Sequence, residues 1–210
     1  MNWIDGILIA LLLASVIVGS KKGLIRELMA FIVFFAAIII SVNYIDRFAV
    51  WVHDQLGGSP LVTAFLSFAI LLAGSYAVFK LCGLIFYKVA QLKNVGKRDQ
   101  MGGALIGFLR GWMAIAFLTV LAFLLPMPDK FYTAFEDSFF GPAIARTIPL
   151  VYDGTAAIHP RHNSFIEQIQ NTLLLSSSTG GSSSGDVSVD RAEVYRVMYQ
   201  FDRFFNDETK

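Results

Sequence analysis

The chain has 210 residues, of which 55% are hydrophobic and only 16% are charged, and its mean hydropathy is +0.59. A soluble domain of this size has about 25% charged residues. The deficit falls mainly in residues 1–125, so we expect an integral membrane protein. The formal net charge of +1 gives no general attraction to nucleic acid. A single cysteine, Cys82, excludes an intrachain disulfide.

Four apolar segments follow one another in the first half of the chain. They cover residues 3–20, 28–44, 61–87 and 101–125, and Pro126 and Pro128 end the last one. Each is close to the roughly 20 residues that a spanning helix needs. The first could be mistaken for a signal peptide, but its basic residues follow it, so we expect it to stay uncleaved. The segments predict an all-α, polytopic membrane protein whose four-helix domain is residues 1–125.

The connections between these segments differ in charge. The first carries Lys21, Lys22 and Arg26, and the third carries Lys88, Lys93, Lys97 and Arg98. The second connection, residues 45–60, has one permanent cation, Arg47. Short basic connections stay in the cytoplasm. We therefore expect both termini to be periplasmic in a bacterial inner membrane.

The fourth segment carries glycines at every fourth position. Gly103, Gly107 and Gly111 share one face of a helix, and such a face lets a neighbouring helix approach at backbone distance. Gly19 and Gly23, at the end of the first segment, are candidates to receive it. The spacing predicts a helix that is buried among other helices.

An arginine, Arg110, lies inside the same segment, where a charge is costly and normally faces protein or water. Glu27 is its first-choice partner, and Arg26 and Asp99 belong to the same polar membrane cluster. Two interpretations stay open: the cluster fixes the register of the helices, or it lines a path for ions or small solutes. At the opposite, outer end, Asn2 and Asp5 open the first helix.

The tail begins with a region rich in aromatic residues and proline, residues 126–175. We expect short helices on the membrane surface, broken by Pro142, Pro149 and Pro160; the alternative is an irregular tail that folds back on the bundle. Residues 176–186 predict a Ser/Gly linker.

The last region, residues 187–210, contains an amphipathic helix over 190–205. Asp190 and Glu193 have capping-box spacing at its start, and an aromatic face follows them. One tethered helix cannot bury that face alone. We expect the lipid surface, a second copy of the chain or an envelope protein to cover it.

Catalytic and metal-binding patterns are missing from the sequence. His159 and His162 have HxxH spacing, but a metal site needs three or four convergent ligands. Ser15 has no base within reach by sequence, so we expect it to bond back to its own helix. We expect no enzyme, no metal and no cofactor.

Four features carry a family resemblance: MNWIDGILIA at the start, GSKKGLIRE at the first turn, RDQMGGALIGFLRG in the fourth segment, and the aromatic stretch after that segment, with Ser138 and Pro142. Together they resemble the colicin V production protein (CvpA) family of bacterial inner-membrane proteins. The resemblance covers about residues 1–150 and implies a role in toxin production or export and in envelope homeostasis. We expect an oligomer or scaffold subunit, and an oligomeric channel or solute pathway is the alternative.

Overall fold

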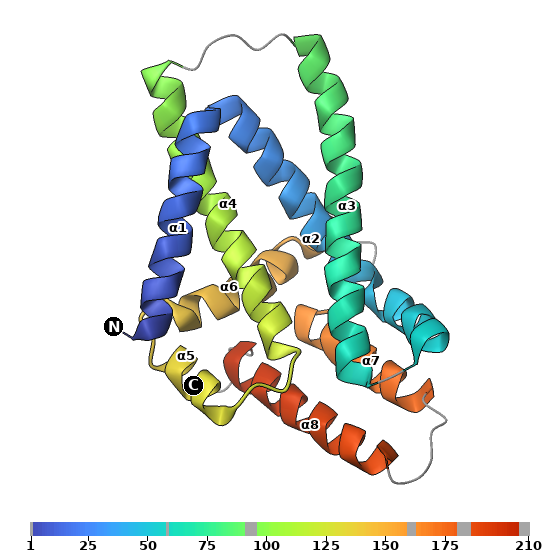
Figure 1. Ribbon diagram of the computed structural model, residues 1–210. Helices are drawn as coiled ribbons and strands as arrows, with labels where there is room; N and C mark the ends of the chain where they lie inside the picture. The colour runs from blue at the N-terminus through green and yellow to red at the C-terminus, as the bar shows by residue number, and fades with distance from the viewer. Residues whose placement is uncertain (1, 58, 91–95, 159–162, 180–185, 206–210) are drawn as a thin grey trace.

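The computed structural model describes residues 2–57, 59–90, 96–158, 163–179 and 186–205 (Figure 1). The elements in these ranges are α1 (Trp3–Lys22), α2 (Leu24–Leu56), α3 (Pro60–Ala90), α4 (Lys97–Phe123), α5 (Asp129–Glu136), α6 (Gly141–Gly154), the short 3-10 helix η1 (Ala156–Ile158), α7 (Phe165–Thr179) and α8 (Asp186–Phe205). No strand occurs in these ranges, so the all-α prediction is confirmed. Four of the helices, α1 to α4, are long and apolar enough to cross a membrane.

The long helices form two pairs. α1 packs against α4, α2 packs against α3, and the helices α5 to α8 gather at the end where α1 begins (Figure 1). We call α5 to α8 the platform. Between the pairs, the rings of Phe68 on α3 and Phe117 on α4 meet edge to face with centroids 4.7 Å apart. The start of α1, the α2–α3 connection and the platform therefore share one end of the molecule, the arrangement that the loop charges predict.

One residue joins α1 to α2. Gly23 has φ 82° and ψ 165°, in the range of φ that favours glycine, and its N–H donates to the carbonyl of Gly19 at 3.1 Å. Because the turn is so short, α2 begins at Leu24, four residues before the predicted start. Glu27 consequently lies in the first turn of α2.

The predicted second connection is wrong, because α2 continues through most of residues 45–60 and ends at Leu56. The buried residues Ile45, Ala49 and Val52 recur at helical spacing, so this polar stretch forms an amphipathic helix that packs on its neighbours. Gly57, with φ 63°, then ends the helix.

The tail forms short helices, as its sequence predicts, but one of the predicted breaks is absent. Pro142 lies at the first positions of α6, where proline is tolerated, but Pro149 lies inside α6 and does not break it. Ile148 and Tyr152, on either side of Pro149, are fully buried. Their burial offsets a proline cost of about 3 kcal/mol.

The linker prediction is also too long. α7 runs to Thr179, so the first four residues of the predicted linker are helical. α8 begins at Asp186, so Asp190 lies inside the helix and the predicted capping box does not start it. Once a helix has nucleated, adding residues costs little, and serine is compatible with a helix that is already formed.

Candidate functional site

The glycine face of α4 packs directly on the backbone of α1. A Cβ atom on Gly107 would lie 2.8 Å from the carbonyl oxygen of Ser15 and 2.9 Å from the Cα of Gly19. A Cβ on Gly103 would lie 2.8 Å from the carbonyl carbon of Gly23. The structure thus brings together the glycines that the spacing selects, and Gly111 continues the same contact against Ser15.

Ser15 joins the two helices. Its hydroxyl donates to the carbonyl oxygen of Gly107 on α4 at 2.6 Å. The expectation that Ser15 bonds back to its own helix is therefore wrong. Because the glycine face allows the backbones to approach so closely, the serine reaches across the interface instead.

The buried ion pair is the pair that the sequence predicts. Nη2 of Arg110 lies 2.7 Å from Oε1 of Glu27, whose side chain is 0% exposed, while that of Arg110 is 18% exposed. The ammonium of Lys22 lies 4.0 Å from the other carboxylate oxygen. An unpaired charge at this position would be costly, so the partners offset one another's desolvation. The pair ties α4 to the first turn of α2.

The other two members of the predicted cluster lie apart from this pair. Oδ1 of Asp99 accepts a hydrogen bond from the backbone N–H of Leu24 at 2.8 Å. It thereby satisfies one of the free donors at the start of α2. Arg26 is exposed on the same turn of α2. The cluster is thus a pair, a helix cap and a surface cation at one end of the bundle.

At the opposite end, Asn2 and Asp5 anchor the platform. Asn2 caps α1 and donates from its side chain to the carbonyl of Ala134 in α5 at 3.0 Å. Oδ1 of Asp5 accepts from the N–H groups of Phe139 and Phe140 at 2.9 and 3.2 Å, and Asp5 is fully buried. The sequence placed these residues at the start of the first helix, but only the fold shows that Asp5 holds the turn between α5 and α6.

The aromatic face of α8 is covered by the same chain. Phe123, the last residue of α4, meets the rings of Phe201, Phe204 and Phe205 edge to face at centroid distances of 6.3, 4.9 and 5.3 Å. All four side chains are buried. The expectation that this face needs a cover from outside the chain is therefore wrong, because the platform and the end of α4 supply it.

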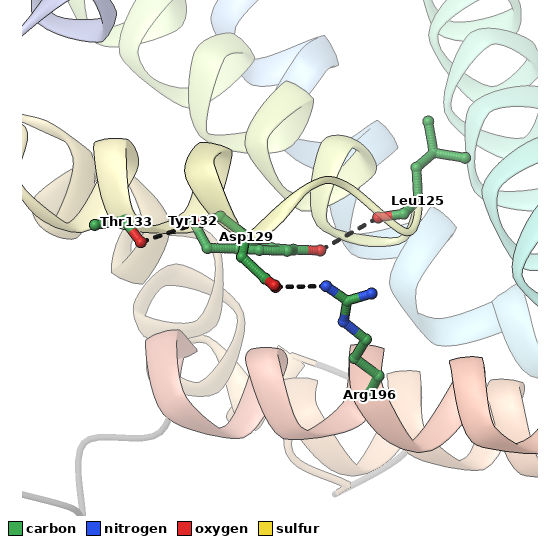
Figure 2. A network of polar contacts seen from close by, with 5 residues as sticks. All are labelled: Leu125, Asp129, Tyr132, Thr133 and Arg196. Carbon is green, nitrogen blue, oxygen red and sulfur yellow. Dashed lines mark hydrogen bonds and ion pairs between the residues drawn. The ribbon is translucent and has the colours of Figure 1, made fainter.

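A polar network joins the start of α5 to α8 and to the connection that follows α4 (Figure 2). Asp129, at the start of α5, pairs with Arg196 of α8, and the hydroxyl of Thr133 donates to the carbonyl of Asp129 at 3.1 Å. The hydroxyl of Tyr132 donates to the carbonyl of Leu125 at 3.4 Å. Burial raises the pKa of Tyr132, so its phenol stays protonated as a donor.

A second ion pair, Arg203 with Glu136, repeats the first pair two turns further along both helices. Sequence reasoning missed these pairs, although two acidic and two basic residues at the same spacing of seven could have indicated them. All four side chains are about half exposed or more, so the pairs set the register of α8 on α5 and add little stability.

A cavity of about 420 Å³ lies between the two helix pairs. Its walls are mostly apolar, and Arg110 is the first residue of α4 to line it on the side away from the platform. Lys80 of α3 lies next to it, with Nζ 5.8 Å from the ring centroid of Tyr76, another lining residue.

His159 and His162 lie outside the described residues, as does the side chain of Cys82. In the part of the chain that the structure describes, no three His, Cys, Asp or Glu side chains are grouped so that they could hold a metal ion.

Comparison with known proteins gives a family match over most of the chain. The family described as colicin V production protein matches residues 4–149. The curated relative named colicin V production protein, from Escherichia coli (strain K12), is 27% identical over 119 residues, which is 55% of this chain and 70% of the relative. No solved structure matches the chain.

Proposed function

The chain belongs to the colicin V production protein family, and from that premise we propose that it supports colicin V production or toxin export and envelope homeostasis. In this proposal it acts in a bacterial inner membrane as an oligomer or scaffold subunit. The structure supplies four helices that could span the membrane and a folded platform at one end. We assign the platform the role of docking other envelope proteins.

The observation that carries this proposal is the way the platform is fastened. Asp5, buried in the first turn of α1, holds the α5–α6 turn, and Phe123 at the end of α4 holds α8. A platform that is tied to two membrane helices at both sides presents a rigid surface. Rigid surfaces lose less conformational entropy on docking, which suits a scaffold.

Charge supports a periplasmic platform. Lys21, Lys22 and Lys97 lie at the end of the bundle away from the platform, and short basic segments stay in the cytoplasm. Cysteine labelling in intact cells tests this orientation in a Cys82→Ala background. A membrane-impermeant maleimide should modify Tyr199→Cys on the platform and leave Lys97→Cys unmodified. The reverse pattern would overturn the proposed topology.

Complementation tests the biological role. The chain is expressed in an Escherichia coli strain that lacks its own colicin V production protein, and colicin V release and survival of envelope stress are measured. We expect partial or full restoration, with an Asp5→Asn variant weaker than the parent. No restoration by a chain that is folded and inserted would count against the proposal.

Oligomerisation is tested separately by native mass spectrometry in mild detergent and by crosslinking in cells. A strict monomer with no crosslinked envelope protein would refute the scaffold role. No catalytic role is part of the proposal. Loss of function on replacing both His159 and His162 by alanine, in a chain that still folds, would reopen one.

A channel or small-solute pathway is the second candidate, because Arg110 lines a cavity between the two helix pairs. Solute flux from vesicles that contain the purified protein tests it. A solute flux that changes in the Arg110→Lys variant would favour the pathway. A flux no greater than that from protein-free vesicles would refute it.

A further inference from the structure

The two helix pairs separate on the side where α3 faces α4. α3 stands apart from α4 at the end away from the platform, whereas the last turns of α1 pack on the glycine face of α4 (Figure 1). The cavity of about 420 Å³ lies in this gap, with Leu72 and Ala73 on α3 facing Ala114 and Leu118 on α4. Both Ala73 and Leu118 are exposed, so the cavity opens sideways, toward the surface that a membrane would surround.

The charges near the cavity lie at one end. Arg110 and Tyr76 are the lining residues furthest from the platform on their helices, and Lys80 lies one turn beyond Tyr76. Lys22 is also near this end, through its contact with Glu27. Arg110 is paired with Glu27, and Lys80 adds a positive charge at this end of the apolar walls.

We propose that this cavity binds one anionic phospholipid of the adjoining leaflet. An acyl chain occupies the apolar walls between α3 and α4, and the headgroup phosphate lies at the mouth beside Lys80 and Arg110. Basic pockets between membrane helices are the usual sites for anionic headgroups. The inference is independent of the proposed scaffold role, because it concerns the membrane-spanning half of the chain.

The size of the cavity favours a lipid over a helix from a second copy. The lining residues extend over about two turns of α3, from Ala69 to Tyr76, and about three turns of α4, from Arg110 to Leu121, whereas a spanning helix has five or more turns. A flexible acyl chain is narrow enough to enter, and a cavity of this volume is within the range of ligand sites.

Photolabelling in lipid nanodiscs tests the proposal. The full chain is placed in phosphatidylcholine nanodiscs with a trace of phosphatidylglycerol or phosphatidylcholine, each bearing the same diazirine-labelled acyl chain, and adducts are mapped by mass spectrometry. We expect adducts on Leu72 and Leu118 to be about fivefold stronger with phosphatidylglycerol, since one basic residue near the surface contributes about 1 kcal/mol. Labelling of Leu13, exposed on α1, should show no headgroup preference.

Two variants test the contact with the acyl chain and the contact with the headgroup separately. Ala73→Trp should fill the cavity and abolish the adducts, while Ala10→Trp, the same change on an exposed face of α1, should leave them unchanged. Lys80→Gln should keep the adducts and remove most of the preference for phosphatidylglycerol. Equal labelling by both lipids in the parent chain would refute the proposal, as would crosslinks at Ala73 to a second copy.

Discussion

Replacing Gly107 tests the packing of α1 on α4. A Cβ at this position would lie 2.8 Å from the Ser15 carbonyl oxygen, so the helices must separate by about 0.6 Å to restore an ordinary contact of 3.4 Å. A gap of about 0.5–1 Å removes a quarter to a half of a van der Waals attraction, and the loss extends over neighbouring turns. The separation also weakens the hydrogen bond from Ser15 to Gly107, worth about 1 kcal/mol.

We therefore expect Gly107→Ala to lower the free energy of unfolding by about 1–2 kcal/mol and Gly107→Leu by about 3 kcal/mol. Gly74 is the matched control, because a Cβ there meets nothing within 4 Å. Gly74→Ala should be neutral or should stabilise by up to about 1 kcal/mol, since alanine is the better helix former.

The measurement is equilibrium unfolding of the purified protein in mixed detergent micelles with increasing dodecyl sulfate, followed by circular dichroism. If Gly107→Ala proves as stable as Gly74→Ala, the glycine face of α4 does not pack against α1. The close contact between the two backbones would then be refuted together with the prediction.

Three further predictions concern the polar and aromatic contacts. Glu27→Gln should destabilise by about 3 kcal/mol because Arg110 is left without its counter-charge, and the double variant with Arg110→Met should recover much of the loss in the same unfolding assay; additive losses would contradict the pairing. Asp5→Asn should speed amide hydrogen exchange in the α5–α6 turn, because one carboxylate oxygen of Asp5 accepts hydrogen bonds from two amides there. An unchanged exchange rate would show that the turn is stable without Asp5. Phe123→Ala should cost about 3–5 kcal/mol and release α8 to limited proteolysis, whereas Phe139→Ala, at a side chain 76% exposed, should do neither.

Some elements could be predicted because their signal is local. An apolar run of spanning length and a repeat of small residues every fourth position both depend on neighbours along one helix. The four long helices, the face made by Gly103 and Gly107, and the need of Arg110 for a partner followed from such patterns. Errors appeared where tertiary contacts outweighed local preference, as at Pro149, which stays helical because its neighbours are buried.

The candidate site divides in the same way. Glu27 could be chosen for Arg110 because helix length and topology bring the first turn of one helix near the middle of another. The burial of the aromatic face of α8 could not be predicted, because Phe123 and Phe204 are 81 residues apart in the sequence. In the structure their ring centroids are 4.9 Å apart. The role of Asp5 at the α5–α6 turn also spans more than 130 residues.

The sequence by itself determined that the chain is helical, apolar enough to cross a membrane, and built for close approach of α4 to another helix. Periodicity and hydropathy suffice for these conclusions, because both patterns lie within one segment and do not depend on which other segments contact it. Only the tertiary structure decided that the tail forms a platform tied to α1 and α4, and that α3 leaves a cavity beside Arg110. Those features depend on which surfaces meet after folding, and burial between distant segments has no periodic signal in the chain.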